Sequence, residues 1–135
     1  MRLGVCIAAH GAPANDFPEE RLRQFFALSA GGHHHGGAGG TNLAELEREI
    51  RSWPRTPEND PYKAGVEAVA SSLRWLGYDL IEAGFNEFCD PTVEEAIERL
   101  IAAGAETVVV ASTMLVPGGG HAEILFKLLD KVGAA

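Results

Sequence analysis

Two histidines and one glutamate are the residues whose side chains could carry out metal or acid–base chemistry: His10, His121 and Glu87. Each follows a stretch that is typical of a β-strand, and ligands of open α/β sheets bind beyond the carboxyl ends of the strands. Imidazole groups bind first-row divalent metals and exchange protons near neutral pH, and a carboxylate can assist either task. For each residue taken alone, a purely structural role is about as well supported: His10 could be a turn histidine, and Glu87 an ordinary loop acid.

Three glycines stand directly before His121, at Gly118, Gly119 and Gly120. Because glycine has no Cβ, such a loop permits positive φ angles and a close approach of the backbone to a ligand. A helical pattern of apolar residues begins at His121. This glycine–histidine loop is therefore expected to form the functional edge of the protein.

A second group of histidines, His33 to His35, lies in the glycine-rich segment 30–40. The segment has no apolar side chain larger than that of alanine and cannot bury a face, so we expect a mobile loop. Three adjacent histidines could bind a divalent metal loosely, but structural zinc sites draw four ligands from separated positions. A solvated loop and a metal-collecting arm both remain open.

Apolar runs predict strands at residues 3–9, 78–84 and 107–111, and helical spacing predicts helices at residues 19–28, 43–53, 61–75 and 93–103, with a further helix beginning near residue 121. We expect residues 3–9 to form a central strand, and residues 107–111 to form a strand that is central and buried on both faces. Alternation of strands and helices implies a parallel sheet with right-handed crossovers. The predicted fold is a single α/β domain over residues 1–135: a small doubly wound parallel sheet of three strands, with helices on both faces.

Composition excludes several classes of partner. The 135 residues carry a formal net charge of -8, which disfavours nucleic acid or an anionic membrane as the main partner. No apolar run approaches the roughly 20 residues that span a bilayer, and we expect no signal peptide. Cys6 and Cys89 both lie in apolar surroundings and do not suggest a disulfide scaffold, so a cytoplasmic setting is expected.

Common catalytic and nucleotide-binding motifs are absent from the sequence. It has no Gly-x-Ser-x-Gly nucleophile elbow, no phosphate-binding loop ending in Gly-Lys-Ser/Thr, and no Gly-x-Gly-x-x-Gly after a strand. We therefore predict no organic cofactor.

Two segments together resemble a known family. A first strand that ends in Ala9-His10-Gly11, combined with Pro-Gly-Gly-Gly-His-Ala-Glu at residues 117–123, is similar to the small class II tetrapyrrole chelatases. These are the sirohydrochlorin cobalto- and ferrochelatases of the CbiX/SirB type. The segment 84–97, which contains Glu87, looks like the acid-bearing strand end and following helix of that family. The resemblance covers roughly residues 1–16 and 61–123, whereas the span 17–60 is longer than in the smallest members.

The resemblance implies a chelatase-like half-domain that inserts Co(II) or Fe(II), with Ni(II) as a further candidate, into sirohydrochlorin or a related tetrapyrrole. It implies that His10 and His121 bind the metal and accept pyrrole protons, that Glu87 is an acidic partner, and that the protein is a homodimer. The substrate-binding residues that we expect are Gly118, Gly119, Gly120, Met114 and Phe85. A non-catalytic metal or tetrapyrrole carrier that retains the histidines is the main alternative, and a hydrolytic enzyme that uses His10 as a base is a third.

Overall fold

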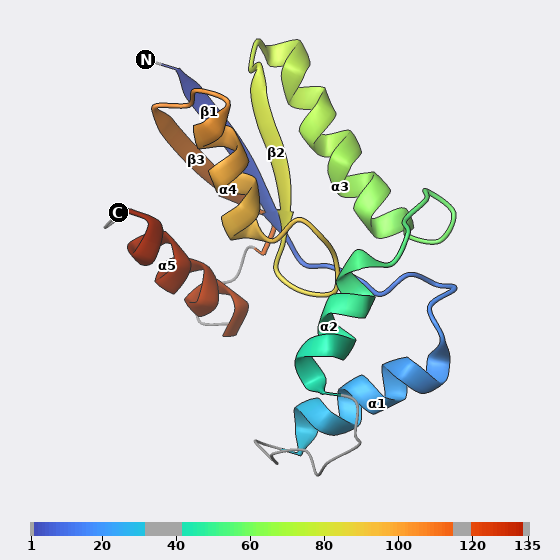
Figure 1. Ribbon diagram of the computed structural model, residues 1–135. Coiled ribbons are helices and arrows are strands. Elements are labelled where there is room, and N and C mark those ends of the chain that lie inside the picture. The colour runs from blue at the N-terminus through green and yellow to red at the C-terminus, as the bar shows by residue number, and fades with distance from the viewer. Residues whose placement is uncertain (1, 32–41, 115–119, 134–135) are drawn as a thin grey trace.

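Three parallel strands form the centre of the molecule in a computed structural model (Figure 1). The structure describes residues 2–31, 42–114 and 120–133, and within 120–125 it describes the backbone alone. Strand β1 (Leu3–Ala9) lies between β2 (Leu80–Phe85) and β3 (Thr107–Ser112), which gives the order β2-β1-β3. The sheet pairs Ala9 with Phe85 and Ala8 with Ser112, so all three strands end at the same edge.

The helices in chain order are α1 (Glu19–Ala30), α2 (Leu43–Ser52), α3 (Pro61–Ser72), the 3-10 helix η1 (Leu73–Leu76), α4 (Val93–Ala102) and α5 (Gly120–Gly133). The starts of α2, α3 and α4 follow local capping chemistry. Asn42 and Thr92 each form a capping box with the glutamate three residues later, and the Asp60 carboxylate accepts from the Lys63 amide at the start of α3. These boundaries confirm the predicted helices to within a few residues.

Helices cover both faces of the sheet, as the doubly wound fold class predicted (Figure 1). On one face, Val66 and Ala70 of α3 pack against alternate residues of β1 and β2. On the other face, α4 packs against Cys6 and Ala8, and apolar residues of α5 join the same cluster. The side-chain alternation of β1 thus supplies both core layers, and all of β1 after Leu3 is buried.

Strand β3 differs from its prediction. We expected it to be central and buried on both faces, but within the described sheet it is an outer strand and β1 alone is central. Val108 and Val110 face α4 and are partly buried, whereas Val109 on the α3 side is 47% exposed. An unbroken β-branched run signals strand propensity, and it does not reveal whether a helix extends far enough to cover the strand.

Some apolar side chains of the helices are exposed. Val69 of α3 is exposed, and so are Phe26 and Leu28 of α1. In these two helices the apolar residues extend beyond the stripe that the core can cover.

Helices α1 and α2 lie beyond the carboxyl edge of the sheet rather than on either face (Figure 1). They have a small core of their own around Ala14, Phe17 and Ile50, to which Trp53 and Phe88 add their rings. Phe88 belongs to the loop after β2, so this added unit is in direct contact with the loop that carries Glu87. Among the helices of the described residues, none is long and apolar enough to cross a membrane.

Candidate functional site

His10 and Glu87 meet at the carboxyl edge of the sheet. His10 Nδ1 lies 2.9 Å from Glu87 Oε1, and the Asn86 side-chain amide donates to Glu87 Oε2 over 2.7 Å. The side chains are partly accessible: His10 is 43% exposed and Glu87 25%. The structure thus joins two of the three predicted site residues in one hydrogen-bonded pair, and Glu87 is partly buried there.

The pairing has a consequence for the imidazole ring. A carboxylate accepts hydrogen bonds and does not donate them, so in the neutral ring the proton belongs on Nδ1, which donates to Glu87. The lone pair is then on Nε2. A histidine oriented by a carboxylate in this way is the arrangement that proteins use to present a nitrogen to a metal or a proton.

Backbone geometry explains why the two residues meet. Pairing of β1 with β2 continues past the strand ends, because the Asn86 amide donates to the Ala9 carbonyl over 2.8 Å. Gly11 then passes very close to the loop: a Cβ at this position would lie 1.6 Å from the Glu87 carbonyl oxygen. Only glycine permits this approach. The Ala-His-Gly sequence therefore places a histidine where its neighbour allows the loop to close over the strand end.

The residue that follows β3, Thr113, is hydrogen-bonded to the carboxyl end of β1. Both the amide and the hydroxyl of Thr113 donate to the Ala8 carbonyl, over 2.9 Å and 3.2 Å. The chain passes from β1 to β2 on one side of β1 and then returns across the sheet to β3 on the other side. The gap beyond β1 and β3 is therefore the topological switch point at which such sheets bind ligands.

Several predicted residues fall outside what the structure describes. Gly118 and Gly119 belong to the segment 115–119, and His33 to His35 belong to the segment 32–41, neither of which is described. Gly120 opens α5, and His121 lies in its first turn, with only its backbone described. Whether His121 approaches His10 therefore stays a prediction.

The two predicted apolar contact residues have different surroundings. Phe85 is 1% exposed and packs in the core between the sheet and α3, so its ring is not at the accessible edge. Met114 is partly buried against the α4 side of the sheet, directly after β3. Of the two, Met114 has the more accessible side chain, and its contact with a ligand stays a prediction.

Sequence reasoning missed two arginines beside this site. Arg51, in the last turn of α2, donates to the carbonyls of Asn86 and Cys89 over 3.1 Å and 2.7 Å. Arg55 donates to the carbonyls of Ala12 and Phe88, over 2.6 Å in both cases. The sequence gives no signal for these contacts, because every residue has a backbone carbonyl and residue type does not show which carbonyl an arginine will bind.

Both cysteines are buried free thiols. Burial, together with a smaller effect of the nearby Glu82 carboxylate, raises the pKa of the Cys6 thiol from 9.0 to about 12. Burial also raises the pKa of Cys89, in the loop after Glu87. Both groups are therefore neutral thiols at physiological pH and poor metal ligands. In the described part of the chain, no cluster of three or more His, Cys, Asp or Glu side chains could hold a metal ion.

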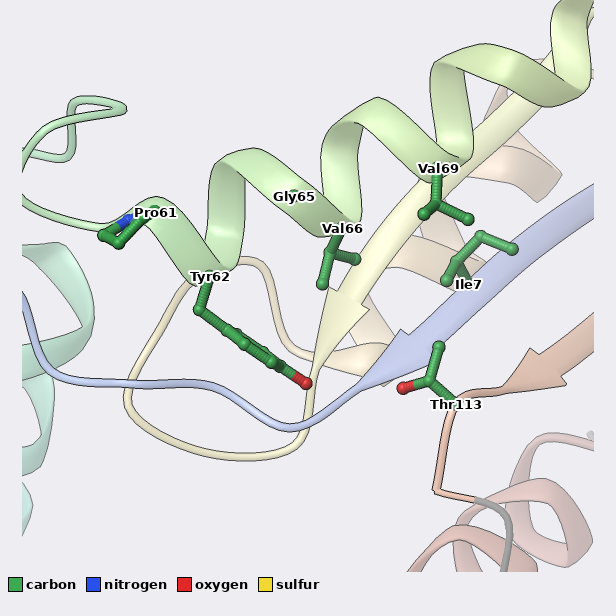
Figure 2. A pocket seen from close by; sticks show the side chains of 7 residues that line it. All are labelled: Ile7, Pro61, Tyr62, Gly65, Val66, Val69 and Thr113. Carbon is green, nitrogen blue, oxygen red and sulfur yellow. The ribbon is translucent and has the colours of Figure 1, made fainter.

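An apolar hollow of about 320 Å³ opens between α3 and the carboxyl ends of β1 and β3. Figure 2 shows Tyr62, Val66 and Val69 of α3 on one side, with Ile7 of β1 and Thr113 opposite. It borders the switch point on the α3 side, where β3 is left uncovered.

Comparison with known proteins identifies relatives for part of the chain. The family model CbiX matches residues 57–134, which is more than half of the chain. A sirohydrochlorin cobaltochelatase of Methanopyrus kandleri is 35% identical over 54 residues, covering 39% of this chain and 38% of the relative. A second, of Methanococcus maripaludis, is 44% identical over 46 residues, covering 34% of this chain and 31% of the relative. The matched regions thus span about a third of the length of these relatives. No solved structure is significantly similar to the chain.

Proposed function

The chain belongs to the CbiX family, and we propose that it inserts Co(II) into sirohydrochlorin or a closely related tetrapyrrole. The names of the two curated relatives support cobalt and sirohydrochlorin as the first choice of substrates. The observation that carries the proposal is the His10–Glu87 pair, which lies at the carboxyl edge of the sheet, where β1 and β2 end, next to the switch point beyond β1 and β3. The metal is a substrate in this reaction and is not a resident cofactor.

The chemistry of insertion matches this pair. When a divalent metal enters the ring, two pyrrole nitrogens lose their protons, and bases must accept them. With its proton on Nδ1, His10 offers Nε2 either to the incoming metal or to a pyrrole proton. Glu87 keeps the ring in this orientation and balances the positive charge when His10 is protonated.

His121 is assigned as the second base and metal ligand. Its support is the family resemblance of segment 117–123 and its place in the first turn of α5, the element that follows β3 in the chain. Gly118 to Gly120 would let the backbone approach the flat ring, and Met114 would pack against it. Imidazole ligands also bind Fe(II) and Ni(II), so these ions are further candidates.

We also propose that the active form is a homodimer. The uncovered α3-side face of β3 and the neighbouring hollow offer apolar surface for a second copy, and two copies together would enclose a large macrocycle better than one open edge.

Optical titration tests the proposal. Co(II) is added to wild type, His10→Ala, Glu87→Gln and His121→Ala, with and without sirohydrochlorin, and the spectrum of the metallated ring is followed. We expect insertion to fall by about 100-fold or more in His10→Ala and His121→Ala, the size of a lost acid–base group. The matched control replaces the other histidines, His33 to His35, with serine, and it should keep the wild-type rate at saturating Co(II).

The carrier alternative makes the opposite prediction. If wild type binds Co(II) only through His33 to His35 and never metallates the ring, the proposed activity is wrong.

A further inference from the structure

We infer that Arg51 and Arg55 are positioning residues that hold the His10–Glu87 pair in its working geometry. The positioning role is argued from hydrogen bonds, and its effect on catalysis rests on the proposed function. Both arginines come from the span between β1 and α3, which the family resemblance does not cover and in which no functional residue was predicted.

Arg51 donates hydrogen bonds to the loop backbone on both sides of Glu87. One terminal nitrogen donates to the Asn86 carbonyl and the other to the Cys89 carbonyl. Its remaining Nε–H donates to Glu47 one turn earlier on α2, over 3.3 Å. The side chain is only 10% exposed, so these contacts are shielded from water. The planar guanidinium thereby fixes the carbonyls that precede and follow Glu87 by one and two residues.

Arg55 joins the two segments that carry the pair. It donates to the carbonyl of Ala12, two residues after His10, and to the carbonyl of Phe88, directly after Glu87. The Asp60 carboxylate, 2.5 Å away, neutralises its charge, and the two side chains are 6% and 1% exposed. Further contacts with the carbonyls of Ile50 and Trp53 hold the guanidinium to the end of α2. One buried cation thus sets the spacing between the His10 and Glu87 segments.

The loop needs such support because its backbone is strained. Phe88 has a φ of 60°, in the left-handed region that non-glycine residues rarely adopt. A conformation of this kind persists when surrounding contacts over-determine it. Here Arg55 donates to the Phe88 carbonyl. The Phe88 ring packs edge-on against Phe25 and Phe26 of α1.

Arginine is required for this task because of its shape. Its planar fork presents five N–H donors in fixed directions, whereas the lysine ammonium is a compact group that cannot bridge two carbonyls in the same way. Arg51→Lys therefore keeps the charge and removes the bridge. Arg23→Lys is the matched control: Arg23 is exposed on α1 and donates to Glu19 over 2.6 Å.

The first test needs no enzymatic activity. Nitrogen-15 NMR of the His10 ring reports which nitrogen carries the proton. Wild type and Arg23→Lys should show the Nδ1–H form that donates to Glu87, whereas Arg51→Lys should show a mixture of the two neutral forms. A wild-type ring spectrum in Arg51→Lys overturns the inference, whether or not the protein is a chelatase.

The second test is a double-mutant cycle on Co(II) insertion into sirohydrochlorin. We expect Arg51→Lys to lower kcat by about 10-fold or more with little change in KM, because misplaced catalytic groups slow the reaction step. If Arg51 acts through Glu87, the same substitution should have little further effect in a Glu87→Gln background. Equal effects in both backgrounds would show a purely structural role and overturn the inference. Absence of insertion by wild type would instead reject the proposed function, leaving the NMR result to decide the positioning role.

Discussion

Gly11 makes the contact between His10 and Glu87 possible, because it has no Cβ to obstruct the Glu87 loop. His10 and Glu87 come from segments 77 residues apart, and their hydrogen bond requires the loop backbone to pass where a Cβ of residue 11 would stand. The glycine thus converts the pairing of two strands into the contact of two functional groups.

We predict that Gly11→Ala displaces the Glu87 loop and destabilises the protein by about 1–3 kcal/mol, the usual cost of overpacking. Gly65 in α3 is the matched control, since a Cβ there would meet nothing within 4 Å. Gly65→Ala should stabilise the helix by up to about 1 kcal/mol. Urea unfolding measures both, and a Gly11→Ala variant as stable as wild type would contradict the close approach.

The buried thiol of Cys6 predicts a pH dependence of stability. Its pKa is raised from 9.0 to about 12 in the folded protein, so the folded state retains a proton that the unfolded state releases. The stabilisation is complete below pH 9 and is lost as the pH rises toward 12. The free energy of unfolding should therefore fall more steeply between pH 9 and 11 in wild type than in Cys6→Ala. Parallel curves for the two proteins would contradict this.

The sequence allowed His10 and Glu87 to be chosen because each follows a strand, and the parallel order of the strands predicted that they would meet. It could not identify Arg51 or Arg55, whose partners are backbone carbonyls. Phe85 was misleading for a related reason: a ring at the end of a strand can face either the edge or the core, and here it faces α3.

Helices α1 and α2 form an accessory unit that supports the site loop from beyond the edge of the sheet. One of its links to the rest of the fold is the buried pair of Arg55 and Asp60, and Asp60 also caps α3. Capping residues made the helix boundaries predictable. The packing of this unit was not, because it depends on contacts between segments far apart in the chain.

Asp60→Ala should destabilise the protein by about 3–5 kcal/mol, because it leaves Arg55 buried without a counter-charge. The control is Glu67→Ala, which removes an exposed pair with Lys63 on the same helix and should change stability by less than about 1 kcal/mol. Thermal or urea unfolding gives both values. Equal effects would mean that the Arg55–Asp60 pair is more hydrated than its burial indicates.

The described part of the fold has three layers, a sheet between two layers of helices, and one face of the sheet is covered more fully than the other. α4 and α5 cover one face, whereas α3 leaves the outer strand β3 uncovered on the opposite face. The doubly wound architecture followed from the alternation of strands and helices. The open face did not, because residues 107–111 are equally apolar on both sides.

Two valines at paired positions test this open face. Val5 and Val109 are neighbours in the β1–β3 register, but Val5 is 7% exposed and Val109 47%. Val5→Thr should cost about 1–3 kcal/mol by burying a hydroxyl, and Val109→Thr about 0.5 kcal/mol or less. A comparable cost at both positions, growing with protein concentration at Val109, would show that a second copy covers this face in solution.

The central claim is catalysis of metal insertion, and the most direct measurement is the number of turnovers. Protein is mixed with Co(II) and sirohydrochlorin in large excess over the protein, and the metallated ring is followed against a protein-free control. We predict that each wild-type chain metallates many rings and that the His10→Ala rate is close to that of the protein-free control. A single equivalent of bound, unreleased product, or equal rates with and without His10, would contradict it.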